Sequence, residues 1–162
     1  MHLHTLITSS LLSLTLAAPL TKRFVESTPW RLSNIRAFTA SPGPTGVSSI
    51  TFHFCDTNAG LELETECSRY LAPGSGRSPI DPDTFYPCAN NTVGFKYTGR
   101  EIVVQRTYID PSVGSPTTAE FPATWYVTAG GQANTTFEVA SDEAGSWAYE
   151  RELSVRITTL IA

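Results

Sequence analysis

Residues 61–67 read LELETEC and alternate apolar and acidic side chains more regularly than any other stretch of the chain. One set comprises Leu61, Leu63, Thr65 and Cys67, and the other comprises Glu62, Glu64 and Glu66. Alternation with a period of two is typical of a β-strand that buries one face. The stretch therefore predicts a strand with its three carboxylates on one side and its apolar residues on the other.

Short runs with the same period recur on both sides of this strand, separated by Gly, Pro, Asn and Asp. They predict further strands at 30–38, 48–54, 93–97, 101–108, 123–128, 135–139 and 149–161. Gly130-Gly131 is predicted to turn the chain, and 68–71 could form a single helical turn. No window has a helical period with capping residues. Seven to ten short strands at this spacing predict an all-β fold, either a compact antiparallel β-barrel or a β-sandwich.

The N-terminus has the composition of a secretory leader. An apolar stretch ends in small residues at Ala17, which predicts a signal peptide at 1–17. Lys22-Arg23 is a dibasic pair of the kind that processing proteases cut, so 18–23 would be a short pro-peptide. An ordinary uncleaved basic pair is the alternative. The expected mature product is a single secreted, extracellular domain at 24–162.

Charge and histidine content exclude several function classes. The leader carries two of the 11 basic residues and none of the 15 acidic ones, so the formal charge changes from −4 to −6 on its removal. Such a chain is a poor partner for nucleic acid or for an anionic membrane, and no stretch is apolar enough for membrane insertion. His53 is the single histidine left, which argues against a Ser-His-Asp device and against zinc. We expect no metal and no cofactor.

Three cysteines in a secreted chain indicate one disulfide and one remaining thiol. Cys67 and Cys88 bracket a Pro- and Gly-rich segment, 68–87, that cannot order itself by burying apolar surface. We predict that these two cysteines are paired. Cys55 would then be a buried thiol or would bridge to a second chain.

Two N-x-Ser/Thr sequons begin at Asn90 and Asn134. Both lie beside residues typical of turns, where a glycan would reach the surface. They are predicted glycosylation sites, and their occupancy is left open.

Two groups of polar residues resemble catalytic sites. Glu62, Glu64 and Glu66 overlap glycosidase carboxylates in their separations, although a solvent-facing strand would look the same. His53, Cys55 and Asp56 contain a thiol, an imidazole and an acid, but residues two apart on a strand are separated by about 6.6 Å along the backbone. Neither group is interpreted as a catalytic site, and the carboxylates remain the basis of the alternative hypothesis of a hydrolase.

Aromatic residues are the better candidates for a binding surface. Phe85 and Tyr86 stand beside Cys88, and Trp125 and Tyr126 stand between Pro- and Gly-containing stretches. These four side chains are the predicted exposed patch for a partner or ligand.

The order of several short motifs resembles a known family. The motifs are WRLSNI at 30–35, SITFHF at 49–54, Cys67, FYPC at 85–88, FKY at 95–97 and IVVQR at 102–106. In order and spacing they are similar to the fungal AA1-like domain, found in small secreted proteins of the Alternaria major allergen type. The resemblance covers about 30–108 and weakens beyond.

This resemblance implies a compact extracellular β-barrel that serves as an allergen or as an effector meeting plant host proteins, without established catalysis. The conserved cysteine pair of the family would fall on Cys67 and Cys88. Nothing matches the second, C-terminal disulfide of the family, and Cys55 is not at the position of its intermolecular bridge. A monomer or a weak dimer is therefore expected.

The leading hypothesis is a secreted, non-enzymatic β-barrel protein, effector- or allergen-like, that binds a host protein or a small ligand. An extracellular carbohydrate-active hydrolase that uses Glu62, Glu64 and Glu66 is one alternative. A structural cell-surface protein is the other.

Overall fold

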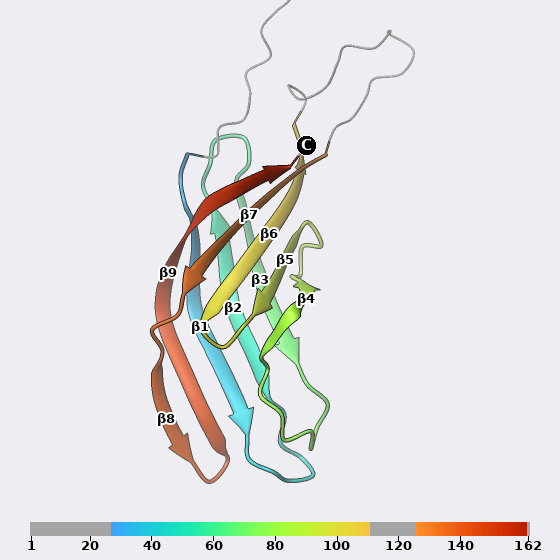
Figure 1. Ribbon diagram of the computed structural model, residues 1–162, viewed down its shortest axis with the longest axis vertical. Coiled ribbons are helices and arrows are strands. Elements are labelled where there is room, and N and C mark those ends of the chain that lie inside the picture. The colour runs from blue at the N-terminus through green and yellow to red at the C-terminus, as the bar shows by residue number, and fades with distance from the viewer. Residues whose placement is uncertain (1–26, 111–125, 162) are drawn as a thin grey trace, which may run out of the picture.

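Alternating side chains along the chain form strands that each bury one face, and all strand pairs are antiparallel. The computed structural model describes residues 27–110 and 126–161 (Figure 1). The strands in these residues are β1 (Trp30–Ala40), β2 (Ser49–Asp56), β3 (Leu63–Tyr70), β4 (Asp81–Pro87), β5 (Val93–Tyr97), β6 (Glu101–Ile109), β7 (Tyr126–Asn134), β8 (Glu138–Asp142) and β9 (Gly145–Ile161). No helix occurs within those two ranges, so none there could cross a membrane.

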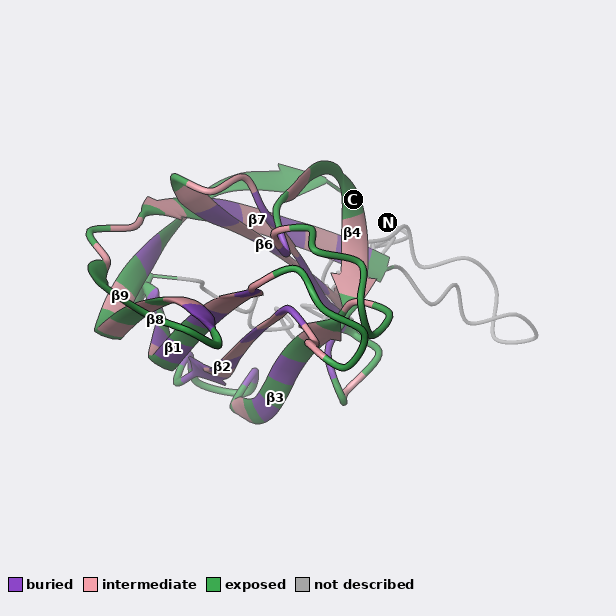
Figure 2. Cartoon of the chain, turned by 90° about the horizontal axis from the view of Figure 1, so that it is seen from below, coloured by how far each residue is buried: buried purple, intermediate pink, exposed green. Residues whose placement is uncertain are grey.

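The strands form one curled sheet in the order β3-β2-β1-β9-β7-β6-β5-β4, and β8 pairs with β9 beside this path. β9 is long enough to belong to both halves of the sheet. Its first part pairs with β1 and β8, and its last part pairs with β7. Figure 2 shows the two halves of the sheet facing each other. We call β8, the first part of β9, β1, β2 and β3 the first wall, and the end of β9, β7, β6, β5 and β4 the second wall. The prediction of an all-β antiparallel barrel or sandwich is confirmed.

The core fills the space between the two walls. Its largest fully buried side chains include Trp30, Phe54 and Phe95. Phe52 of the first wall meets Phe95 of the second edge to face, with 4.9 Å between ring centroids. Such contacts bury the apolar face of both walls at once, which is what stabilises a curled sheet.

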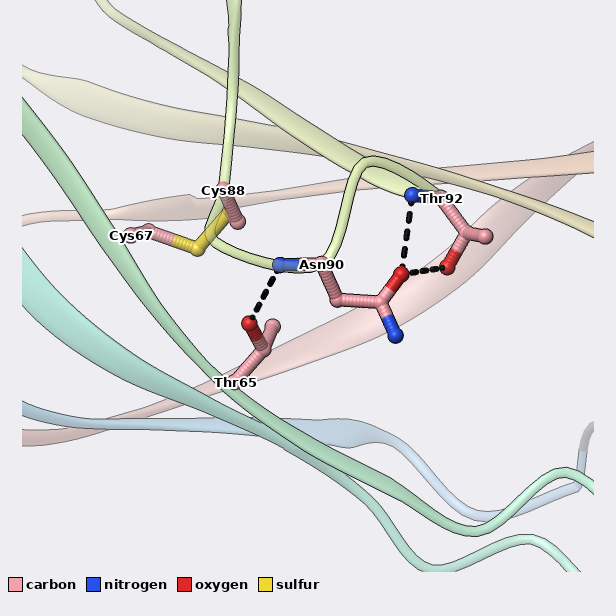
Figure 3. Close-up of a disulfide and its surroundings, with 5 residues drawn as sticks. All are labelled: Thr65, Cys67, Cys88, Asn90 and Thr92. Atoms are coloured by element: carbon pink, nitrogen blue, oxygen red, sulfur yellow. Dashed lines mark hydrogen bonds between the residues drawn. A yellow bond between two sulfur atoms is a disulfide. The ribbon is translucent and has the colours of Figure 1, made fainter.

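A disulfide between Cys67 and Cys88 closes the seam between the two ends of the sheet. Cys67 belongs to β3, and Cys88 directly follows β4, so the bond joins the two strands that end the sheet order. Ala89 N–H donates to the Glu66 carbonyl at 2.8 Å beside it. Asn90 N–H donates to the Thr65 hydroxyl at 2.9 Å (Figure 3). The predicted pairing is thus present, and it holds strand edges together as well as closing a loop.

The Pro- and Gly-rich segment 68–87 is a loop only in its middle, because strands extend into both of its ends. β3 continues to Tyr70, so 68–70 are strand and the single helical turn predicted as possible at 68–71 is wrong, and 81–87 form β4. Polar contacts order this segment: Arg69 pairs with Asp81 at 3.2 Å and lies 4.2 Å from the centroid of the Tyr86 ring. Pro and Asp content concealed β4 because it is an edge strand, where proline is tolerated.

The predicted turn at Gly130-Gly131 is also wrong, because both glycines lie inside β7. β7 pairs with β6 without interruption, whereas its register against β9 shifts between the two glycines. A Cβ at Gly131 would overlap the Arg156 carbonyl and the Val155 side chain. Glycine is needed there for close approach of two strands, which composition alone does not distinguish from a turn.

Candidate functional site

A hollow of about 380 Å³ lies on the outer face of the first wall. Its lining side chains are mostly polar and come from three neighbouring strands. Arg36, Thr51 and Ser68 are in register across β1, β2 and β3. His53 and Glu66 form the next cross-strand pair.

An irregularity in β1 shapes the hollow. The register between β1 and β2 shifts between Ser33 and Arg36. Asn34, inside this bulge, has a left-handed backbone with φ of 54°, a conformation that asparagine tolerates better than most residues. Leu32 and Ile35 are both fully buried although they are three positions apart. The bulge therefore changes which residues of β1 face outward, and it brings Arg36 to the outer face.

Polar side chains around the hollow lack partners in the part of the chain that the structure describes. No hydrogen bond or ion pair within these residues engages the side chains of Arg36, His53 or Glu66. Arg36 and Glu66 are also exposed, so a partner can reach them. By contrast, Arg69 and Arg106 both form ion pairs. The hollow thus presents hydrogen-bond donors and acceptors that are available to a partner.

Aromatic side chains border the same face. Phe38 pairs with Trp147 across β1 and β9, and their ring centroids are 4.1 Å apart. Tyr149 is the cross-strand neighbour of Arg36. Trp147 is 44% exposed, Tyr149 38% and Tyr70 65%. We call Arg36, Phe38, Tyr70, Trp147 and Tyr149 the aromatic-arginine face.

None of the residues of the aromatic-arginine face is among the binding residues predicted from the sequence. The sequence signal for this face is that Trp147 and Tyr149 flank Ala148, just as Arg36 and Phe38 flank Ala37. The two stretches are paired across β1 and β9. The bulge at Asn34 hid the outward direction of Arg36, because a strict period of two counted from Trp30 places that residue on the buried side.

The His53, Cys55 and Asp56 group does not form a catalytic unit. The Cys55 thiol lies between Arg31 Nη2, at 3.9 Å, and Glu64 Oε1, at 3.6 Å, and does not bond to His53. Cys55 is a free cysteine and only 4% exposed. Burial, followed by the neighbouring Glu64, raises the pKa of its thiol, so the thiolate is disfavoured.

Asp56 instead anchors a buried network that joins the two walls. Its carboxylate pairs with Arg106 of β6 and accepts a hydrogen bond from Trp30 Nε1 at 2.9 Å. Its other oxygen accepts bonds of 2.8 Å from the backbone and side-chain amides of Asn58. Arg106 also donates to the Leu61 carbonyl. Because these groups satisfy one another inside the barrel, Asp56 has a structural role.

The carboxylates of Glu62, which precedes β3, and of Glu64 and Glu66 on β3 have separate environments. Glu62 accepts a bond from Gly60 N–H at 3.0 Å, and backbone N–H groups lower its pKa. Glu64 contacts the Cys55 thiol, and Glu66 alone of the three lines the hollow. All three are exposed. They form no pair across a cleft, so the geometry does not favour the hydrolase alternative.

The four residues of the predicted aromatic patch do not form one surface, because the neighbours Phe85 and Tyr86 face opposite sides of the second wall. Tyr86 packs against the core, and its hydroxyl donates to Asp81 at 2.6 Å. Phe85 is half-buried beside Lys96, and Tyr126 is 63% exposed. Trp125 lies outside the described residues. Tyr86 turns inward because successive strand residues face opposite sides.

The two sequons differ in local structure. In Figure 3, the side-chain oxygen Oδ1 of Asn90 accepts hydrogen bonds from Thr92 N–H at 3.0 Å and from the Thr92 hydroxyl at 2.7 Å. Asn134 ends β7, and the Thr136 hydroxyl of its sequon donates to Glu150 at 2.8 Å. Glycosylation of both stays a prediction. The processing residues Ala17, Lys22 and Arg23 lie outside the described residues.

In the residues that the structure describes, no group of three or more His, Cys, Asp or Glu side chains is arranged to hold a metal ion. The fold and the site thus define an all-β domain of curled-barrel type with an exposed aromatic and polar face.

One solved structure with the same fold is the crystal structure of the Alternaria alternata allergen Alt a 1. Its TM-score is 0.54 at 12% sequence identity, over 88% of this chain and 95% of that chain. At this identity the likeness concerns the fold. No protein-family model matches the chain, and no curated protein matches it in sequence.

Proposed function

We propose that this chain is a secreted, non-enzymatic protein of the effector or allergen type that binds a protein partner through the aromatic-arginine face. The observation that carries the proposal is the cross-strand cluster of exposed Trp147, exposed Tyr149 and Arg36, which has no ion-pair partner within 27–110 and 126–161, beside a polar hollow. Secretion is supported by the composition of the leader and by the disulfide.

Residue types at this face favour a protein as the partner. Trp, Tyr and Arg are the residues that most often dominate binding energy at protein interfaces. The stack of Trp147 on Phe38 already restrains the indole ring, so little side-chain freedom is lost on binding. Charged groups of both signs, Arg36 and Glu66, lie at the hollow and can specify orientation.

Comparative capture tests the proposal. The mature protein is immobilised and incubated with plant extracellular fluid, and retained proteins are quantified for wild type, Trp147→Ala and Arg36→Ala. A retained protein is then purified and titrated against each variant. Truncation of an anchor residue costs about 2 kcal/mol or more, so its affinity for Trp147→Ala should be roughly 30-fold weaker.

Tyr126→Ala is the matched control, because Tyr126 is an exposed aromatic residue of the second wall. It should bind like wild type. Arg36 is exposed and unpaired in the described residues, so Arg36→Ala should leave the melting temperature unchanged and separate binding from folding. Equal retention of every captured protein by wild type, Trp147→Ala and Arg36→Ala would contradict the proposal.

A further inference from the structure

A second hollow lies on the outer face of the second wall, away from the aromatic-arginine face. Its volume is about 210 Å³, and β6, β7 and β9 supply most of its lining. Gln105, Gly130 and Thr159 are in register across these three strands and run along its floor. Two strand spacings make this row about 10 Å long, so the hollow is a short trough that crosses the strands.

Gly130 leaves the floor of the trough open without a requirement from the fold. Its φ is outside the left-handed region, and a Cβ built there would come no closer than 3.7 Å to the Thr159 Cβ. Glycine in a strand is unfavourable because it loses more conformational freedom on folding than other residues. A glycine that neither backbone nor packing requires is consistent with close approach of a ligand to the strand.

Gln105 supplies an amide at the edge of this opening. Its side chain leans over Gly94, since a Cβ there would be 3.4 Å from Gln105 Nε2. The space above Gly130 therefore stays free. In the described part of the chain this amide has no hydrogen-bond partner, and Gln105 is one of the residues that line the trough, so its two donors and its acceptor are available to a ligand there.

The polar residues in the rest of the lining are all uncharged, and they stand among apolar residues such as Val103, Val104 and Ile161. Gln132, Thr128 and Thr159 add an amide and two hydroxyls, and none of the lining residues is charged. Amides and hydroxyls both donate and accept, which matches ligand hydroxyl groups. Phe85 adds an aromatic ring, and Lys96 Nζ lies 5.2 Å from its centroid, outside the lining. A neutral ligand rich in hydroxyls, with a C–H face to place on a ring, fits this combination.

We propose that the trough over Gly130 binds a neutral carbohydrate chain. Sugar hydroxyls would bond to Gln105, Gln132 and Thr159, and a sugar ring would pack against Phe85 with its backbone-facing side over Gly130. The site is on the opposite wall from the protein-binding face, so it is an additional activity and does not depend on the proposed function.

Affinity electrophoresis tests this site. The mature protein is run through native gels that contain a soluble neutral polysaccharide, namely a β-glucan, a xylan, a xyloglucan or a galactomannan, or acidic polygalacturonate. We expect retardation by at least one neutral polysaccharide. Gly130→Leu fills the trough and should abolish it, whereas Gln105→Ala should weaken it about tenfold, the share of one hydrogen bond of usual strength.

Control variants keep the test decisive. Trp147→Ala and Arg36→Ala should be retarded like wild type, because both residues lie on the first wall. Melting temperatures establish whether Gly130→Leu is folded. If it is not, Gln105→Ala serves instead, because the half-buried Gln105 amide has no partner in the part of the chain that the structure describes. Absence of retardation by every neutral polysaccharide, retardation by polygalacturonate alone, or undiminished retardation of both trough variants would overturn the proposal.

Discussion

Arg36 and Arg106 lie on strands of opposite walls and differ entirely in their surroundings. Arg106 is buried, pairs with Asp56 and donates to the Leu61 carbonyl, while its Nε atom has no partner among the described residues. Arg36 is exposed and unpaired in the described residues. A buried arginine whose partners are all internal contributes to the fold, whereas an exposed one between aromatic side chains is available for recognition.

Cys55 provides a prediction about reactivity. Its thiol is buried with a raised pKa, and reactive cysteines require exposure and thiolate character. We expect iodoacetamide to label the native protein very slowly at pH 7 and to label one cysteine at once after denaturation without reductant. Rapid labelling of the native protein, or no labelling after denaturation, would contradict a buried free thiol.

Asp81 provides a prediction about pH. The Tyr86 hydroxyl, followed by backbone N–H groups and Arg69, lowers the pKa of its carboxyl. A lowered folded pKa stabilises the protein above the ordinary aspartate pKa of about 4, and this contribution is lost as pH falls through the lowered value. Asp81→Asn should therefore melt below wild type at pH 7.

The difference in melting temperature between Asp81→Asn and wild type should shrink as pH is lowered below about 4. Asp83→Asn is the control, because Asp83 is exposed two residues along the same strand. A difference that is the same at pH 7 and at pH 2 would show that the carboxylate charge is not involved.

At the scale of elements, β7 depends on two adjacent glycines with different roles. Gly131 allows close approach of the Arg156 carbonyl, whereas a Cβ at Gly130 would make only ordinary van der Waals contacts, at 3.7 Å or more. Replacement by alanine should therefore have different effects on stability at the two positions.

Gly131→Ala should destabilise the protein by about 1–3 kcal/mol, the usual cost of overpacking. Gly130→Ala should be neutral or stabilising by about 0.5–1 kcal/mol, because alanine costs less conformational entropy. Urea denaturation of both variants measures the difference. Equal effects at the two positions would contradict the strand contacts described here.

The Cys67–Cys88 disulfide, which links β3 to the end of β4, is a second feature at the scale of elements. The chain-entropy estimate for a loop of this length is about 3 kcal/mol, and Cys67→Ser or Cys88→Ser should lose about that amount. Hydrogen exchange should rise first in β3 and β4, the strands that the bond joins. An unchanged melting temperature, or faster exchange confined to other strands, would contradict the role of the seam.

At the scale of the molecule, the sequence predicts what depends on local periodicity. The alternation at 61–67 and the bounds 93–97 are found in the structure, because each strand buries one face. β4 and the continuous β7 could not be predicted, because they contain Pro, Asp and Gly residues that usually indicate turns. Pairing with neighbouring strands holds these residues in extended structure.

Long-range contacts explain why the candidate site was missed. The Asp56 and Arg106 pair joins residues 50 positions apart. Similarly, Arg36, Trp147 and Tyr149 come together only through the pairing of β1 with β9. Individually these aromatic and charged residues have no sequence signature, so the face exists only in the assembled sheet.

Oxidative footprinting is the most direct test of the central claim that the aromatic-arginine face binds a protein. The mature protein would be exposed to hydroxyl radicals alone and in complex with the captured partner. We predict that Trp147 and Tyr149 become protected, while Tyr126 on the second wall is oxidised equally in both states. Protection of Tyr126 with unchanged oxidation of Trp147 and Tyr149 would contradict the account.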